Sequence, residues 1–389
     1  MTSVLIGTTK GAFILDDVDA AGGHNLRGPF CDGWPINHVV GDGTGHVWAA
    51  GGGDWHGAGV WHSPDNGDTW NLYKFSGGDL DKWAREDAEF ATMFGYVPMD
   101  LPFDGEIVNL WSLCICGDRI FAGAKPATLY VSEDKGASWS KVSSLTDHPS
   151  AEEWQPGGAG LTLHTIVTDP RAPQKLWIAI SVAGVFASED GGTTWERRNK
   201  LSNGEFAAAD NSDPASPRNG EIGHCVHNMV RARRDDHDIL YQQNHEGVFR
   251  SRDGGRIWDD ISDGLPTRFG FPISVHPEDP ETIWTLPLNG DSLGRYPPDA
   301  VAAVWKSTDA GETWAAKRAG LPQSGCFFTV LRQAMATGPD AGSGAFFGTN
   351  TGSLFASFDG AETWAEIARH LPTVLSVEVL PDLSFSRST

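Results

Sequence analysis

The chain has 389 residues and a formal net charge of −22, which excludes two classes of partner. Nucleic acids and anionic membranes are bound through clusters of lysine and arginine, so we expect neither as a partner. No segment approaches about 18 consecutive apolar residues, and the first residues lack the basic stretch and apolar run of a signal peptide. The five cysteines are odd in number, and a chain of this length needs no disulfide staple. We therefore predict a cytoplasmic protein.

An eight-residue pattern, Ser-x-Asp-x-Gly-x-Thr-Trp, recurs along the whole chain. Its six copies begin at Ser63, Ser132, Ser188, Ser251, Ser307 and Ser357. The serine, aspartate and tryptophan are kept in every copy, and Ala361 replaces the glycine in the last. Copies that start 50 to 69 residues apart indicate a repeat architecture.

The residue types of this pattern suit a tight turn between two strands. An aspartate accepts hydrogen bonds from backbone amides a few residues further on. A glycine adopts a positive φ without steric cost, and threonine and tryptophan favour the strand that follows. The pattern therefore predicts a hairpin turn, and it contains no catalytic constellation.

The repeat is identified as the Asp-box, or bacterial neuraminidase repeat, and the chain resembles the Asp-box β-propellers. These include sialidases, xyloglucan-degrading glycosidases, sortilin-type receptors and photosystem II assembly factors. The resemblance implies a propeller but no single activity, because the box occurs in enzymes and in non-enzymes. The Arg-Ile-Pro motif of sialidases is absent from the first strands, which read VLIGTTKGAF, so a standard sialidase is not expected.

Short apolar segments around each box predict an all-β fold of four-stranded antiparallel blades, with the box between the third and fourth strands. The inner strand of the sixth blade is predicted to begin near residue 325. Residues 373–380 read as an inner strand without partners, and residues 4–8 and 11–15 read as second and third strands without an inner one. Joined, they close a seventh blade and leave no open edge. We predict one domain over residues 1–389, with six or eight blades as the alternative.

Nearly all of the additional chain is predicted to lie on one face of the propeller. The long segments are residues 73–106, 141–160, 198–222 and 288–303. They connect a fourth strand to the next blade or a second strand to a third, and these two kinds of connection share one face. Loops on a rigid scaffold commonly carry function, so we predict the site on that face. The first segment is also predicted to contain a short helix.

Three inner strands carry a histidine at what we predict to be the same register, near the channel mouth on that face. These predicted metal ligands are His38, His164 and His227. Neutral imidazoles bind Zn²⁺ or Mn²⁺, so we predict a divalent ion and no organic cofactor. Catalytic groups are predicted from nearby loops, namely Asp54, His56, His245 and Glu246. In the alternative interpretation, the histidines bond neighbouring blades or line a wet channel.

The predicted function is that of an enzyme, a metal-assisted or histidine-based hydrolase or lyase. Its substrate is predicted to be a small, polar, carbohydrate- or lactone-like molecule. The first alternative is a non-catalytic binding or assembly module. The second is a glycoside hydrolase with two carboxylates, although no motif selects the pair. The sequence leaves the substrate, the metal and the oligomeric state open.

Overall fold

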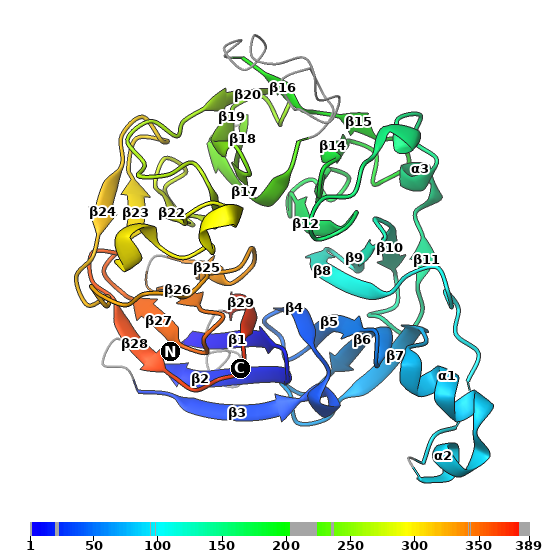
Figure 1. Cartoon of the computed structure of the whole chain (residues 1–389). Helices are drawn as coiled ribbons and strands as arrows, with labels where there is room; N and C mark the ends of the chain where they lie inside the picture. The colour runs from blue at the N-terminus through cyan, green and yellow to red at the C-terminus, as the bar shows by residue number, and fades with distance from the viewer. Residues whose placement is uncertain are drawn as a thin grey trace, which may run out of the picture.

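The computed structural model describes residues 2–19, 23–93, 95–97, 99–202, 224–234, 237–340, 342 and 344–380. Seven β-sheets form a ring, and the two ends of the chain meet in one of them (Figure 1). The predicted seven-bladed, all-β propeller is thereby confirmed. We number blades 1 to 6 after the box that each contains, and the seventh sheet is called the closing blade.

The strands of each blade run antiparallel and follow the chain outward from the channel. Blades 1 to 3 comprise β4 (Ile36–Gly41), β5 (Val47–Gly53), β6 (Gly57–Ser63) and β7 (Asn71–Ser76); β8 (Asn109–Cys116), β9 (Arg119–Lys125), β10 (Leu129–Ser132) and β11 (Ser140–Lys141); and β12 (Leu163–Thr168), β13 (Leu176–Ile180), β14 (Gly184–Ser188) and β15 (Glu196–Arg197). Blades 4 to 6 comprise β17 (Val226–Arg234), β18 (His237–Asn244), β19 (Gly247–Ser251) and β20 (Ile257–Asp260); β21 (Gly270–Val275), β22 (Ile283–Pro287), β23 (Val304–Ser307) and β24 (Ala315–Lys317); and β25 (Met335–Thr337), β26 (Ala345–Gly348), β27 (Leu354–Ser357) and β28 (Ala365–Ala368). A short strand, β16 (Lys200–Leu201), pairs in parallel with β20.

The closing blade is built from both ends of the chain. Its order from the channel outward is β29 (Val374–Leu380), β1 (Thr2–Thr8), β2 (Gly11–Val18) and β3 (Asn25–Phe30). The first three strands match the prediction, and β3 is an outer strand that was not predicted from the sequence. Because β29 and β1 pair from Ser3 with Leu380 to Thr8 with Val374, with one register shift between Gly7 and Thr8, a backbone ladder ties the two ends together.

The boxes form the predicted turns between the third and fourth strands. In blade 3, the Ser188 hydroxyl donates to Asp190 (2.8 Å) and accepts from the Gly192 amide (2.8 Å). The Asp190 carboxylate also accepts from the Thr194 amide (2.8 Å) and hydroxyl (2.7 Å), which lowers the pKa of Asp190 to about 2. The serine and amide contacts recur in the other five boxes, including the last, where Ala361 takes a φ of +68°.

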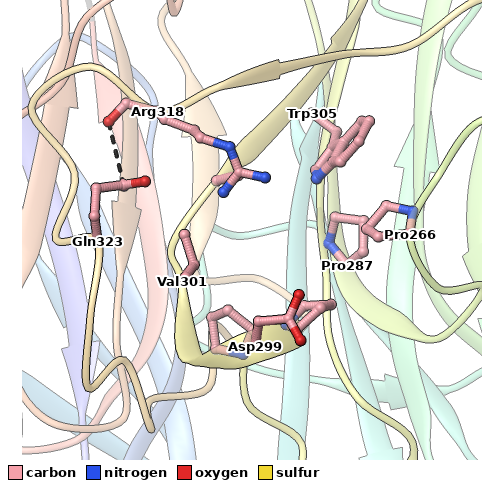
Figure 2. Close-up of a pocket in the computed structure, with 10 residues that line it drawn as sticks. Pro266, Pro287, Asp299, Val301, Trp305, Arg318 and Gln323 are labelled. Atoms are coloured by element: carbon pink, nitrogen blue, oxygen red, sulfur yellow. Dashed lines mark hydrogen bonds between the residues drawn. The ribbon is translucent and has the colours of Figure 1, made fainter.

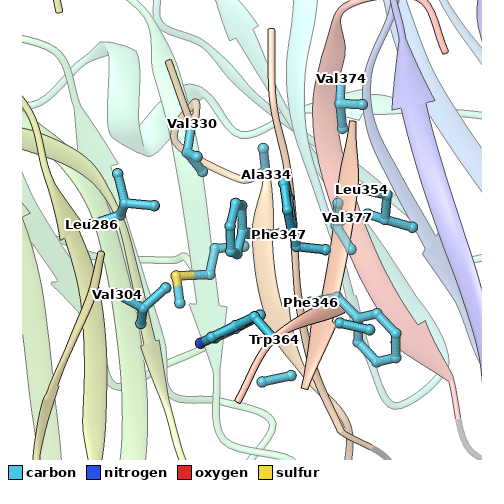
Figure 3. Close-up of a cluster of buried hydrophobic side chains, with 14 of the residues drawn as sticks. Leu286, Val304, Val330, Ala334, Phe346, Phe347, Leu354, Trp364, Val374 and Val377 are labelled. Atoms are coloured by element: carbon cyan, nitrogen blue, oxygen red, sulfur yellow. The ribbon is translucent and has the colours of Figure 1, made fainter. Parts of the chain in front are cut away.

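Hydrophobic clusters fill the spaces between neighbouring blades. One of them joins blades 5 and 6 to the closing blade (Figure 3). There Phe346, Phe347 and Trp364 of blade 6 pack with Val374 and Val377 of β29. The C-terminal strand is therefore held by packing as well as by backbone pairing.

The segments between strands contain the helices. These are α1 (Asp79–Glu86), α2 (Ala88–Met93) and α3 (Ser143–Thr146), with short 3-10 turns at Cys31–Gly33, Ala151–Glu153, Asp291–Leu293 and Pro298–Ala300. Helices α1 and α2 project beyond the ring (Figure 1), which confirms the helix predicted in the first segment. No helix among the described residues is long and apolar enough to cross a membrane. Most of the predicted segment 198–222 lies outside the described residues.

Helix α1 is fixed to blade 1 by a buried ion pair. The Asp81 carboxylate accepts from Lys74 Nζ (2.5 Å) and from the Tyr96 hydroxyl (3.0 Å). The Lys74 and Asp81 side chains are 8% and 1% exposed. Because separating the pair would leave a buried charge without a partner, this ion pair holds the projecting segment in place.

The inner strands contain β-bulges near the channel mouth, and these correct the predicted histidine register. In blade 1 the pairing passes from Ile36 with Gly51 to His38 with Ala50, so the bulged residue is Asn37. The bulged residues in blades 3 and 4 are His164 and His227. His38 therefore lies one residue further along its strand, and the prediction of one shared register was wrong in blade 1.

The inner strand of blade 6 also differs from its prediction, since β25 begins at Met335 rather than near residue 325. Before β25 the chain turns, and the Ala334 amide donates to the Leu331 carbonyl (3.1 Å). A turn replaces the expected extended strand, and it carries Arg332 to the mouth of the channel.

Candidate functional site

The channel mouth beside blade 4 brings together three side chains that commonly bind metals. The ligand atoms of Cys225, His227 and His245 lie within 4.8 Å of one another. Cys225 immediately precedes β17, His227 is the bulged residue of β17, and His245 immediately follows β18. The His245 amide donates to the Cys225 carbonyl (2.9 Å), which ties the two strand ends together. We call these three residues the blade 4 cluster.

His227 is oriented by the neighbouring blade. Its Nδ1 lies 2.6 Å from the Gly270 carbonyl oxygen, so Nδ1 carries the proton and Nε2 keeps a free electron pair. Its ring contacts those of Phe271 and His245, with centroids 4.8 and 5.5 Å away. Burial, and then the positive charge of Arg332, lower the pKa of His227 well below its usual value. The imidazole is therefore neutral, as metal binding requires.

Cys225 is a free, half-buried thiol. Burial raises its pKa, and the positive charge of Arg332 opposes that effect. The carboxylates of Asp291 and Glu246 also raise this pKa, so both acids lie within electrostatic reach of the thiol. A bound cation would reverse the balance and stabilise the thiolate.

His164 is buried near the same mouth but does not join the blade 4 cluster. Its Nδ1 lies 2.9 Å from the Thr165 hydroxyl, and its Nε2 is buried without a hydrogen-bond partner. Burial and then Arg332 lower the pKa of His164 well below its usual value. Among the described residues, it belongs to no group of three side chains arranged to share an ion.

His38 faces the interior of the channel. It lines a cavity of about 460 Å³ together with Cys114, Arg231 and Glu378. Its Nδ1 accepts a hydrogen bond from the Leu113 amide of blade 2 (2.9 Å), and burial lowers its pKa to about 4. This contact between blades matches the alternative interpretation of the sequence, and it uses the one free electron pair of the neutral imidazole, which a metal would need.

The four predicted catalytic residues lie in two separate places. Glu246 follows His245 at the blade 4 cluster. Asp54 is exposed, and its carbonyl accepts from the Asp79 amide of α1 (2.7 Å). His56 stacks on Trp34 with ring centroids 4.9 Å apart, and burial followed by the charge of Lys74 lowers its pKa. The structure thus groups His245 and Glu246 with His227, whereas Asp54 and His56 lie beside α1.

Two residues of this mouth were not singled out from the sequence. Cys225 could have been noticed, because residues two apart in an extended strand share a face and Cys225-x-His227 is such a pair. Arg332 had no comparable signal. Only the structure places Arg332 at this mouth, where its carbonyl accepts a hydrogen bond from the Asn228 side-chain amide (2.7 Å), 104 residues away in the chain.

A second hollow, of about 410 Å³, lies on blade 5 (Figure 2). Pro266, Pro287 and Trp305 form one side, and Asp299 and Arg318 approach from the other. The hollow lacks any group that the sequence analysis assigned to catalysis, so we place the candidate site at the blade 4 cluster.

These features define the class: the chain is a seven-bladed Asp-box β-propeller, as the repeats implied. No family model matches the chain. The oligoxyloglucan-reducing end-specific xyloglucanase of Emericella nidulans is 23% identical over 219 residues, which are 51% of this chain and 25% of that enzyme. A probable enzyme of the same kind from Neosartorya fischeri is 23% identical over 221 residues, with the same coverage. The match thus spans about a quarter of these curated relatives.

Solved structures that share the fold of this chain include an enzyme and a peptide-bound protein. The GH74 xyloglucanase of Xanthomonas campestris is 19% identical with a TM-score of 0.60, over 95% of this chain and 52% of its own. YCF48 bound to a D1 peptide is 13% identical with a TM-score of 0.53, over 98% of this chain and 96% of its own. At these identities the likeness establishes the fold alone. The function must therefore be argued from the site.

Proposed function

We propose that the chain is a metal-dependent hydrolase or lyase for a small, polar, carbohydrate-like molecule. The active site is the blade 4 cluster at the channel mouth. The observation that supports this proposal best is the convergence of Cys225, His227 and His245 within 4.8 Å. Three protein ligands leave an open position for water or substrate, as catalytic sites require.

The donor set favours zinc over manganese. One thiolate and two imidazoles suit Zn²⁺, whereas Mn²⁺ prefers oxygen ligands. Ligand atoms around a tetrahedral zinc ion are roughly 3.3–3.8 Å apart, so the cluster has to contract slightly. Cys225 and His245 are only half-buried, so their side chains have room for that rotation. A bound zinc ion would polarise a substrate oxygen or lower the pKa of a water molecule.

The chain's own residues supply orientation and proton transfer in this proposal. The Gly270 carbonyl holds the Nδ1 proton of His227 and directs Nε2 towards the site. Glu246 lies close enough to raise the pKa of Cys225, so its carboxylate is the proposed general base. The amide of Glu246 donates to the Asn244 side chain (3.2 Å), which helps to fix this loop.

The similarity to xyloglucanases supports a carbohydrate-like substrate, and it keeps the two-carboxylate glycosidase as an alternative. Glu246 and Asp291 are the acids within electrostatic reach of the cluster and are the proposed pair for that reaction. We also propose a cytoplasmic location, because the five cysteines are free thiols and a zinc thiolate needs Cys225 reduced.

The non-catalytic module is favoured by a different observation. Three apolar side chains of the projecting segment are largely exposed, namely Met93 (78%), Val97 (73%) and Met99 (53%). An exposed apolar surface of this kind suits a protein partner. The module therefore remains the second proposal, and it predicts a protein that neither binds zinc nor turns over small substrates.

The test is an activity screen of glycosides, lactones and uronates before and after removal of metal. We expect hydrolysis or elimination that is lost on chelation, restored by zinc and abolished in His227→Ala. The control is His276→Ala, on the opposite face, which should keep full activity. Activity that survives chelation and the His227→Ala substitution would contradict the metal-dependent mechanism. If that surviving activity is lost in both Glu246→Gln and Asp291→Asn, the result would favour the glycosidase.

A further inference from the structure

Arg332 is a cation at the channel mouth without a counter-ion among the described residues. Its Nε is buried and has no hydrogen-bond partner. Burial is the main cause that lowers the pKa of its guanidinium. The residue as a whole is half-buried, and a charge partly withdrawn from water is costly unless it is paired, so an unpaired arginine in a chain with a net charge of −22 requires an explanation.

The groups around Arg332 leave one positive charge uncompensated. The Asp291 carboxylate acts electrostatically on Arg332 but makes no ion pair with it. Arg295 brings a second positive charge, but its Nε is paired with the Asp291 carboxylate at 2.6 Å.

The fold holds Arg332 in this position. Its backbone carbonyl accepts from the Asn228 side chain (2.7 Å), and the Gln333 side chain donates to the His164 carbonyl (2.5 Å). Its guanidinium carbon lies 5.0 Å from the centre of the Phe271 ring. That of Arg295 lies 5.6 Å from the same centre. Two guanidinium groups thus lie near one aromatic ring, and this cation–π contact positions Arg332 without neutralising its charge.

We infer that the mouth binds a small polar molecule through one anionic group, a carboxylate or a phosphate, which pairs with Arg332. Arginine offers a fork of donors that matches either anion, and Arg295 adds to the positive potential. The assignment of this molecule as the substrate rests on the proposed function, since the blade 4 cluster lies beside Arg332. A neutral oligosaccharide would leave Arg332 unpaired, so the chain is expected to discriminate against neutral ligands.

Calorimetric titration of the untagged full chain tests this inference. The probes are galacturonate for the carboxylate, glucose 6-phosphate and inorganic phosphate for the phosphate, and galactose as the neutral match. We expect one of the two anion types to bind and galactose to bind at least tenfold more weakly. Arg332→Gln should weaken the anion about 10- to 100-fold, as the loss of a charged hydrogen bond predicts. Arg318→Gln, an exposed arginine of the blade 5 hollow, is the control and should change nothing.

Equal binding of galactose and the anions, no binding of any anion, or an unchanged affinity in Arg332→Gln would overturn the inference. If Arg332→Gln does not fold, Arg332→Lys keeps the charge without the fork and should give an intermediate affinity. Zinc content measured on the same samples separates the two proposals. Protein that contains zinc but does not bind anions would refute only the anion site. Protein that binds anions but contains no zinc would refute only the metal-dependent function.

Discussion

Glu378 offers a prediction about stability that depends on pH. It lies on β29 opposite Leu5 and lines the channel cavity. Its carboxyl makes no hydrogen bond or ion pair with the other described residues. The neighbouring groups in the cavity do not compensate it, since Cys114 is a neutral thiol and Arg231 is paired with Asp238 at 2.6 Å. Burial accordingly raises the pKa of Glu378 from 4.5 to about 7.

The sign of the effect follows from the two pKa values. Between pH 4.5 and 7 the folded chain holds a proton on Glu378 and the unfolded chain does not, so stability falls as pH rises through this window. The full difference corresponds to about 3.4 kcal/mol at most, and water in the channel reduces it to about 1–3 kcal/mol. Glu378→Gln removes this loss. For a chain of this length the gain is about 1–4 °C in melting temperature above pH 7, and about zero at pH 4.5.

Thermal unfolding of the parent and the Glu378→Gln protein at pH 4.5, 6 and 8 measures this gain. His38 titrates near pH 4 in both proteins, so its contribution cancels in the difference. The exposed Glu133→Gln is the matched control, and it should shift the melting temperature equally at every pH. A gain that is the same at pH 4.5 and 8, or a loss at pH 8, would show that Glu378 is not a protonated, buried carboxyl in the folded chain.

Three further predictions concern the boxes, the projecting segment and the metal. Gly192 and Gly311 both have a φ near +95°. A Cβ added by Gly192→Ala would meet no atom closer than 3.6 Å, whereas the Cβ of Gly311→Ala would clash with the Ile261 side chain. Urea denaturation should therefore show losses of about 1 and 2–3 kcal/mol, and equal losses would contradict the account. Lys74→Met leaves Asp81 buried without its cation, so we expect the free energy of unfolding to fall by about 3 kcal/mol and residues 77–106 to be cleaved faster by proteases. An unchanged rate of proteolysis would contradict this expectation. Chelation should lower the melting temperature of the parent but not of Cys225→Ala, and an equal shift in both would argue against Cys225 as a ligand.

The blades were predictable because their signals are local. The Ser188 hydroxyl and the Gly192 amide are four residues apart, so one short pattern contains every partner of the turn. Six such turns fix the position of the third and fourth strands in six blades. The three remaining apolar segments, one at the C-terminal end and two at the N-terminal end, then had to pair with one another to close the ring.

The candidate site was predictable only in part. His227 and His245 were expected at the mouth and lie there, but the bulge at Asn37 moved His38 out of register, and an apolar pattern does not reveal which residue a bulge leaves unpaired. The loop that carries His56 bends towards α1 because its backbone bonds to that helix. Such contacts join segments distant in sequence, and local patterns cannot indicate them.

Zinc K-edge X-ray absorption of untagged protein, with the zinc content measured alongside, tests whether the blade 4 cluster binds zinc. We expect about one zinc per chain, one sulfur ligand near 2.3 Å and nitrogen ligands near 2.0–2.1 Å. It also predicts that Cys225→Ala loses the sulfur and that His38→Asn keeps the full signal. A protein that stays free of zinc after incubation with the ion, or zinc bound without sulfur, would contradict the account.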